Sequence, residues 1–180
     1  MCELYLLIQL ILNTMENNQP ISFTPKSFIQ RITIIYLALI IGQLLFAGVS
    51  YTLVETNFLS FDFGSDVFVM FVPALAVSGA FASNFIYNKK INELTSLESL
   101  KDKVMGYQTA CIIRFALLEG PALLGIVYYI QTGNLLFLII AGALIVYFVT
   151  LRPTKEKIEM DLNFSFEQKS AFNQMDEVIK

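Results

Sequence analysis

One glutamate, Glu119, lies inside a long apolar stretch and is the first candidate for chemistry in this chain. It lies about eleven residues before the end of that stretch, so a membrane-spanning helix would hold it near the middle of the bilayer. A charged side chain at that depth costs on the order of 2.5 to 3.5 kcal/mol on insertion scales, so a neutral carboxyl that exchanges a proton is the functional interpretation. The structural interpretation is a glutamate that joins helices through a hydrogen bond to Gln43, Ser78 or Arg114. Both stay open from the sequence alone.

Gly120 and Pro121 follow Glu119 directly and predict a kink in its helix. Proline lacks the amide hydrogen, and its ring clashes with the carbonyl four residues earlier. The kink would free a backbone carbonyl beside small residues, where another helix or water can approach. Arg114 is five positions before Glu119, about 140° away around the helix, so the two do not pair within it. We expect Arg114 to snorkel to the head groups; a buried charge pair, or a contact to Glu119 of another protomer, is the alternative.

Two further polar residues lie in apolar stretches, Gln43 in the first and Ser78 in the second. We expect Gln43 to form an interhelical hydrogen bond rather than to bind a ligand. The second stretch also carries small residues at four-residue spacing, such as Gly79 and Ser83. Small residues let helix backbones approach closely, so this face is expected to pack against the third helix or against another copy of the chain.

Composition excludes several classes of function. The chain is 56% hydrophobic and 15% charged, against about 25% charged residues in ordinary soluble domains. Its formal charge of -3 gives no basic patch for nucleic acid. The chain has no histidine, which excludes imidazole ligation of haem or a transition metal. Its two cysteines, at positions 2 and 111, do not form a disulfide framework. Motifs of nucleotide-binding proteins, metalloproteases and serine hydrolases are absent, so we expect neither an enzyme nor a cofactor.

Four apolar stretches predict an all-α protein with four transmembrane helices. The predicted spans are Ile32–Leu53, Val67–Tyr87, a third that ends near Ile130, and Leu135–Leu151. Eleven of the 12 lysines and arginines fall before the first span, between the second and third, or after the fourth, and none falls in the other two loops. The positive-inside rule therefore puts both termini and the middle loop in the cytoplasm of a bacterial cell, with the chain in the inner (plasma) membrane.

The chain divides into three parts. Residues 1–24 are expected to be a flexible N-terminus, with translation starting at Met15. Residues 25–151 form the transmembrane domain, and residues 152–180 a cytoplasmic tail. Within this tail, the apolar residues of 165–180 recur at helical spacing on a charged background. That pattern predicts a short amphipathic helix on the membrane surface or on a partner.

Local signals predict where helices begin and end. Thr24, followed by proline, is a good cap for the first helix, and residues 131–134 predict a tight turn between the last two. Thr95 and Glu98 have the form of a capping box, so the third helix is expected to start near Ser96. Since apolar residues recur every three to four positions through the middle loop, the second and third helices are expected to form a long cytoplasmic hairpin.

The stretch from Leu118 to Val127 reads L-E-G-P-A-L-L-G-I-V. It resembles the carboxylate-bearing helix of subunit c of rotary ATP synthases and of the related V-type proteolipids, with Glu119 at the position of their ion-carrying carboxylate. This resemblance implies a proton- or sodium-binding hairpin in an oligomeric ring. Pro121 departs from that pattern. Over its whole length, with E-G-P-A in the third span, the chain looks more like a four-helix family of bacterial inner-membrane proteins, a resemblance that supplies no activity.

Three functions are compatible with these observations. The first is a proton- or ion-handling membrane subunit in which Glu119 takes up and releases the ion. The second is a non-catalytic scaffold or accessory subunit of an inner-membrane complex, which binds partners through its cytoplasmic hairpin and tail. The third is a small-solute transporter that works as a homo-oligomer, since four helices need a second copy to build an alternating-access cavity. The bilayer, and further copies of the chain or other membrane subunits, are the partners expected.

Overall fold

The computed structural model describes residues 24–61 and 67–179, with side chains for all of these except residues 67 and 68. In this part of the chain the fold is all-α, as the sequence predicts. The longer helices are α2 (Pro25–Leu53), α3 (Val67–Thr95), α4 (Leu100–Thr132) and α5 (Leu135–Val149), followed by α6 (Lys155–Asp161) and α7 (Phe166–Asn173). The expectations for the N-terminus, including a start at Met15, lie outside the described residues.

Three helices are long and apolar enough to cross a membrane: α2, α3 and α4. Their 29, 29 and 33 residues correspond to about 44 to 50 Å, more than the roughly 30 Å of bilayer hydrocarbon. The fourth apolar helix, α5, has 15 residues and is about 22 Å long, shorter than that hydrocarbon core. The apolar helices are therefore compatible with a membrane location.

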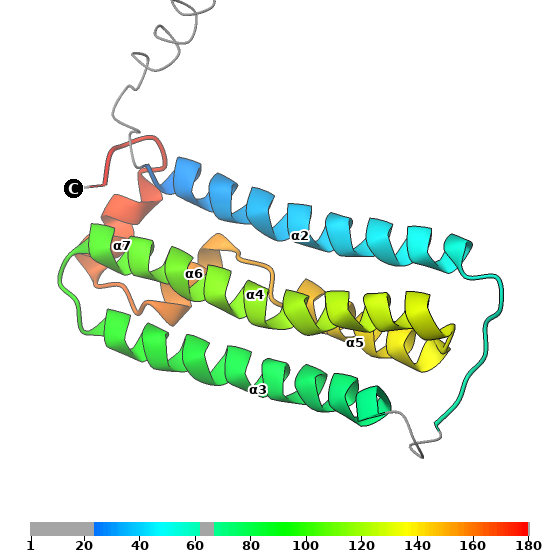
Figure 1. Ribbon diagram of the computed structural model, residues 1–180. Coiled ribbons are helices and arrows are strands. Elements are labelled where there is room, and N and C mark those ends of the chain that lie inside the picture. The colour runs from blue at the N-terminus through cyan, green and yellow to red at the C-terminus, as the bar shows by residue number, and fades with distance from the viewer. Residues whose placement is uncertain (1–23, 62–66, 180) are drawn as a thin grey trace, which may run out of the picture.

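The central helix of the bundle is α4. In the most apolar 18-residue stretch of α4, half of the residues are buried inside the chain. The buried share of the corresponding stretch is 22% in α2 and 28% in α3. Figure 1 shows α4 between α2 and α3, with α5 alongside its second half. Two ring contacts set the register of α2 on α4: Phe28 with Tyr107 and Tyr36 with Phe115. Each pair is 79 positions apart, so a residue of α2 lies level with the α4 residue 79 positions further along the chain.

Close packing of α3 on α4 depends on Gly79. A Cβ at this position would lie 2.8 Å from the carbonyl oxygen of Leu117 and 2.9 Å from Cγ of Pro121. Because Pro121 has no amide hydrogen, the Leu117 carbonyl lacks its usual helical donor, and Gly79 packs directly against it. Gly79 and Ser83 are both buried, which confirms that the small-residue face of α3 packs against the next long helix. Since α4 is one continuous helix through Pro121, the kink expected there stays a prediction.

The turn between α3 and α4 differs from the one predicted. The expected Thr95–Glu98 capping box is wrong, because α3 continues to Thr95 and its hydroxyl donates to a carbonyl of α3 itself. Ser99 caps α4 instead, and its side chain accepts a hydrogen bond from the amide of Asp102. The third long helix therefore begins at Leu100, four residues after the predicted start at Ser96.

Two other local signals are confirmed. Thr24 caps α2, where its side chain accepts a hydrogen bond from the amide of Ser27. At the opposite end of the bundle, Gly133 adopts a φ of 72° and ends α4, and Asn134 caps α5. The turn is covered by the segment after α2, since a Cβ on Gly133 would lie 2.5 Å from the carbonyl oxygen of Thr56. Glycine is therefore required at this turn for both its conformation and its size.

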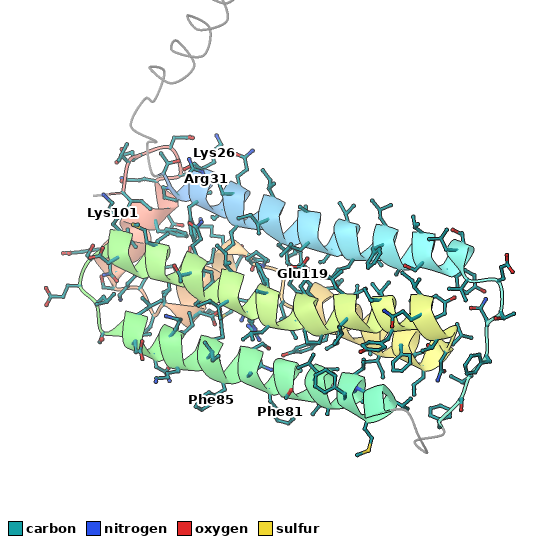
Figure 2. The ribbon with its side chains drawn as sticks, viewed as in Figure 1. Lys26, Arg31, Phe81, Phe85, Lys101 and Glu119 are labelled. Atoms are coloured by element: carbon teal, nitrogen blue, oxygen red, sulfur yellow. The ribbon has the colours of Figure 1, made fainter. Side chains whose placement is uncertain are left out.

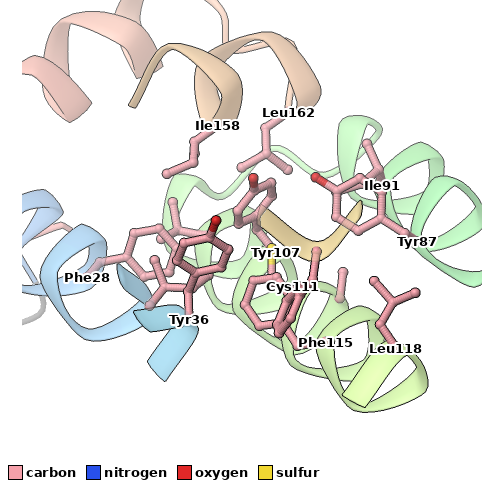
Figure 3. Close-up of a cluster of buried hydrophobic side chains, with 14 of the residues drawn as sticks. Phe28, Tyr36, Tyr87, Ile91, Tyr107, Cys111, Phe115, Leu118, Ile158 and Leu162 are labelled. Atoms are coloured by element: carbon pink, nitrogen blue, oxygen red, sulfur yellow. The ribbon is translucent and has the colours of Figure 1, made fainter. Parts of the chain in front are cut away.

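The chain after α5 folds back against the bundle. The hydroxyl of Tyr36 donates to the carbonyl of Val149 at 2.7 Å, so α5 ends about level with Tyr36 and leaves the first half of α4 uncovered. This space is filled by α6 and α7. Figure 3 shows Ile158 and Leu162 over Tyr107, with α2 and α3 on either side. We call the segment from Lys155 to Ile179 the end cap.

The amphipathic pattern of residues 165–180 has a different role from the one expected. Phe172 is fully buried and Ile179 is 6% exposed, both in the same core cluster as Tyr107. On α4, the buried side chain of Lys103 donates to the carbonyl of Leu162 at 3.5 Å and to Oε1 of Gln168 at 3.2 Å. The expected helix on the membrane surface or on a partner is therefore wrong for these apolar residues, which pack on the chain's own bundle.

Candidate functional site

Glu119 lies at the middle of α4, on the side that faces α2 (Figure 2). The register of the two helices puts it level with Ile40 of α2. Its side chain is half-buried. Within the described residues, no side chain or backbone group forms a hydrogen bond or ion pair with its carboxyl group. The structural interpretation of Glu119, a hydrogen bond to Gln43, Ser78 or Arg114, therefore has no support in this conformation.

Gln43 is the polar residue of α2 that lies closest in level to Glu119. It is 1% exposed, and its Nε2 has no hydrogen-bond partner in the described part of the chain. The register of α2 on α4 puts Gln43 level with Ala122, which is one helical turn from Glu119. A buried amide without a partner costs about 1 to 3 kcal/mol, so this donor is available to an acceptor that enters between α2 and α4.

The other predicted site residues lie on different sides of the bundle. Ser78 is exposed on α3, and its hydroxyl donates to the carbonyl of Leu75 at 3.1 Å. Gly120 is exposed on α4 with no heavy atom near the position of a Cβ. Pro121 is buried against Gly79. Of the six residues predicted, the structure therefore brings Gln43 and Glu119 near one level of one helix pair, and it separates Ser78 from them.

Arg114 is buried in the bundle, with 8% of its surface exposed. One of its terminal nitrogens, Nη2, donates to Oδ1 of Asn84 at 2.5 Å, and its guanidinium carbon lies 4.3 Å from the ring centre of Tyr87. The Nε atom has no partner among the described residues, and no carboxylate among them is within ion-pair distance. The expected snorkelling is therefore wrong: two α3 side chains hold the arginine inside, and its charge is stabilised by an amide oxygen and an aromatic face.

A polar network surrounds Arg114 and joins four helices. Asn84 of α3 also donates through Nδ2 to the hydroxyl of Tyr147 on α5, at 2.5 Å. The hydroxyl of Tyr87 donates to Oδ2 of Asp161 on α6, also at 2.5 Å. Asp161 is paired with Lys157 one turn earlier, at 3.2 Å. This network ties the end cap to α3 and links the buried positive charge of Arg114 to α5 through Asn84.

Sequence reasoning missed Asn84, Tyr87, Tyr147 and Asp161 as members of this site. A partial signal exists for Asn84 and Tyr87, since they are three positions apart and so lie on one face of a helix that also carries small residues. Asp161 is more than forty positions from Arg114 along the chain, in a charged tail with several other carboxylates. Nothing in the local pattern distinguishes it from a solvated residue.

Metal-ligand and thiol groups were located in the part of the chain that the structure describes. Among the described residues, no group of three or more cysteine, aspartate or glutamate side chains is placed to hold a metal ion. Cys111 is a free, buried thiol in the same core cluster as Tyr107. Comparison of the chain with known protein families, curated proteins and solved structures gives no match. The candidate functions therefore depend on the geometry of Glu119, Gln43 and Arg114.

Proposed function

We propose that this protein is an integral membrane protein with four transmembrane helices, with both termini and the α3–α4 turn on the cytoplasmic side of a bacterial inner membrane. The charge distribution supports this orientation, because Lys26, Arg31 and Lys101 all lie at one end of the bundle (Figure 2). α5 is the fourth span in this proposal. It is short, and the end cap packs beside the cytoplasmic half of α4, which α5 does not reach.

Within that membrane, the protein is proposed to be a proton- or ion-handling subunit in which Glu119 takes up and releases the ion. One observation supports this: Glu119 is half-buried at the middle of α4, the helix proposed as the third span, with no partner in the described part of the chain. A carboxylate isolated in hydrocarbon is costly, so binding a proton or a cation is strongly favoured there. The unpaired amide of Gln43, one turn away, supplies a donor that favours the charged form when the ion leaves.

Infrared difference spectroscopy tests proton exchange at Glu119 directly. The full chain is reconstituted in lipid nanodiscs and titrated with alkali while the band of protonated carboxyl groups is followed. We expect a carboxyl band that disappears with rising pH, is absent from Glu119→Gln, and is kept in the control Glu93→Gln, which alters an exposed glutamate of α3. A wild-type spectrum without a titrating band that depends on Glu119 would rule out the proton-handling proposal.

A scaffold function remains the second candidate, and one feature of the end cap favours it. A hollow of about 350 Å³ lies between the α3–α4 turn and α7, and Glu98, Glu167 and Glu177 are among the residues that line it. Such an acidic surface is suited to a basic segment of a partner subunit. Charge reversal by Glu167→Lys, at an exposed position, should then release a co-purifying partner at unchanged chain stability. Partner recovery that is the same in Glu167→Lys and wild type would count against it.

A further inference from the structure

An apolar groove runs along the surface of the bundle between α3 and α5. It has a volume of about 290 Å³, and its lining includes Pro73, Ala76, Val77 and Ala80 of α3 and Ala143 and Tyr147 of α5. From Pro73 to Ala80, the part of α3 that lines the groove advances about 10 Å, which is about a third of the roughly 30 Å hydrocarbon core. The groove therefore has the polarity of a site for part of one lipid tail.

The apolar groove borders a polar network that has unused hydrogen-bond donors. Tyr147 lines the groove, its hydroxyl accepts a hydrogen bond from Asn84, and no described residue accepts the hydroxyl proton. Asn84 in turn accepts from Arg114, whose Nε also has no partner within the described residues. One hydrogen-bonded chain thus leads from the groove to a buried guanidinium group. The two groups of this chain that have no acceptor among the described residues, the Tyr147 hydroxyl and Arg114 Nε, are both hydrogen-bond donors, and the guanidinium group carries a positive charge.

From this arrangement we propose that the groove binds an anionic phospholipid. One acyl chain lies along α3 and α5, and the acidic head group lies at the Tyr147–Asn84–Arg114 end. The buried arginine has no carboxylate partner among the described residues, so an acidic head group that accepts a hydrogen bond from Tyr147 supplies the missing negative charge at the end of the Tyr147–Asn84–Arg114 chain. The exposed Lys89, which lies beyond Asn84 on α3, adds a second cation near the head-group level. This site is independent of Glu119.

Retention of lipid during detergent extraction tests the proposal. The full chain is reconstituted in nanodiscs that contain equal amounts of phosphatidylglycerol and phosphatidylcholine, extracted in a mild detergent, and weighed by native mass spectrometry. We expect phosphatidylglycerol to be retained over phosphatidylcholine by about tenfold, because the trimethylammonium group of phosphatidylcholine cancels its phosphate charge and leaves no net charge to attract Arg114 and Lys89. Ala143→Leu, at an exposed position in the groove, should abolish retention. The control Ala74→Leu, at an exposed position of α3 outside the groove, should leave it unchanged.

A second variant separates the head group from the tail. Tyr147→Phe keeps the ring in the groove but removes the hydroxyl that links the head group through Asn84 to the charge of Arg114, so it should reduce the preference for phosphatidylglycerol while lipid is still retained. Equal retention of both lipids by the wild type, or phosphatidylglycerol retention that survives Ala143→Leu in a folded chain, overturns the proposal. Displacement of the lipid by glycerol 3-phosphate alone would also overturn it, because it would mean that a free phosphate is bound without need of the groove.

Discussion

Replacing Gly79 with alanine should destabilise the bundle, although alanine is the better helix former. A helix interior gains about 0.5 to 1 kcal/mol when glycine is replaced by alanine. At Gly79 the new Cβ would be 2.8 Å from the Leu117 carbonyl oxygen and 2.9 Å from Pro121 Cγ. The first of these is a backbone atom that cannot rotate away, so the overpacking cost of about 1 to 3 kcal/mol applies. Gly42→Ala is the matched control, since no atom lies within 4 Å of its Cβ position.

Cys111 provides the assay. It is 3% exposed, and the chain has two cysteines, so a Cys2→Ser background leaves one buried thiol whose maleimide reaction reports opening of the bundle. The helix-propensity gain is common to both variants, so Gly79→Ala should label about 5- to 150-fold faster than Gly42→Ala, which corresponds to about 1 to 3 kcal/mol. Adding Pro121→Ala, which removes one of the two contacting atoms, should reduce the difference. Equal labelling rates in the two alanine variants would refute this account of α3–α4 packing.

Three more changes should each alter stability in the same assay. Ile158→Ala removes a fully buried side chain of the end cap and should cost about 2 to 5 kcal/mol; Met160→Ala, on the exposed side of α6, is its control. Gly133→Ala should cost at least about 1 to 2 kcal/mol, because its φ is 72° and the Thr56 carbonyl blocks the new Cβ; a neutral effect would contradict the turn. Tyr87→Phe should cost about 1 to 2 kcal/mol through loss of the hydrogen bond to Asp161, and Asp161→Asn should then add little.

The sequence predicts the long helices of this protein well, because their signals are local. Each apolar run marks the position of a helix, and the Thr24 cap, which sets the start of α2 before the apolar run begins, depends only on neighbours in the chain. The start of α4 was predicted too early because Thr95 and Ser99 are both good caps. Packing decides between them: Leu94 lies against Gly106 at the α3–α4 contact, and so α3 is extended to Thr95.

The environments of Arg114 and of the tail could not be predicted because both depend on distant segments. An arginine near a membrane boundary can snorkel unless a neighbouring helix holds it, and here Asn84 and Tyr87 do so. An amphipathic tail has the same pattern whether it lies on lipid, on a partner or on its own bundle. Phe172 fills a space beside α4 that α5 is too short to occupy. That space can be recognised only once the helices are placed in three dimensions.

The proposal that Glu119 is an accessible, ion-exchanging carboxyl is tested most directly by chemical labelling in intact membranes. A hydrophobic carbodiimide reacts with protonated carboxyl groups in hydrocarbon, and peptide mass spectrometry identifies the modified residue. We expect modification of Glu119, more at low pH than at high pH, and no modification at position 119 in Glu119→Gln. An unmodified Glu119, in membranes where a water-soluble carbodiimide labels the exposed Glu98 and Glu167, would contradict it.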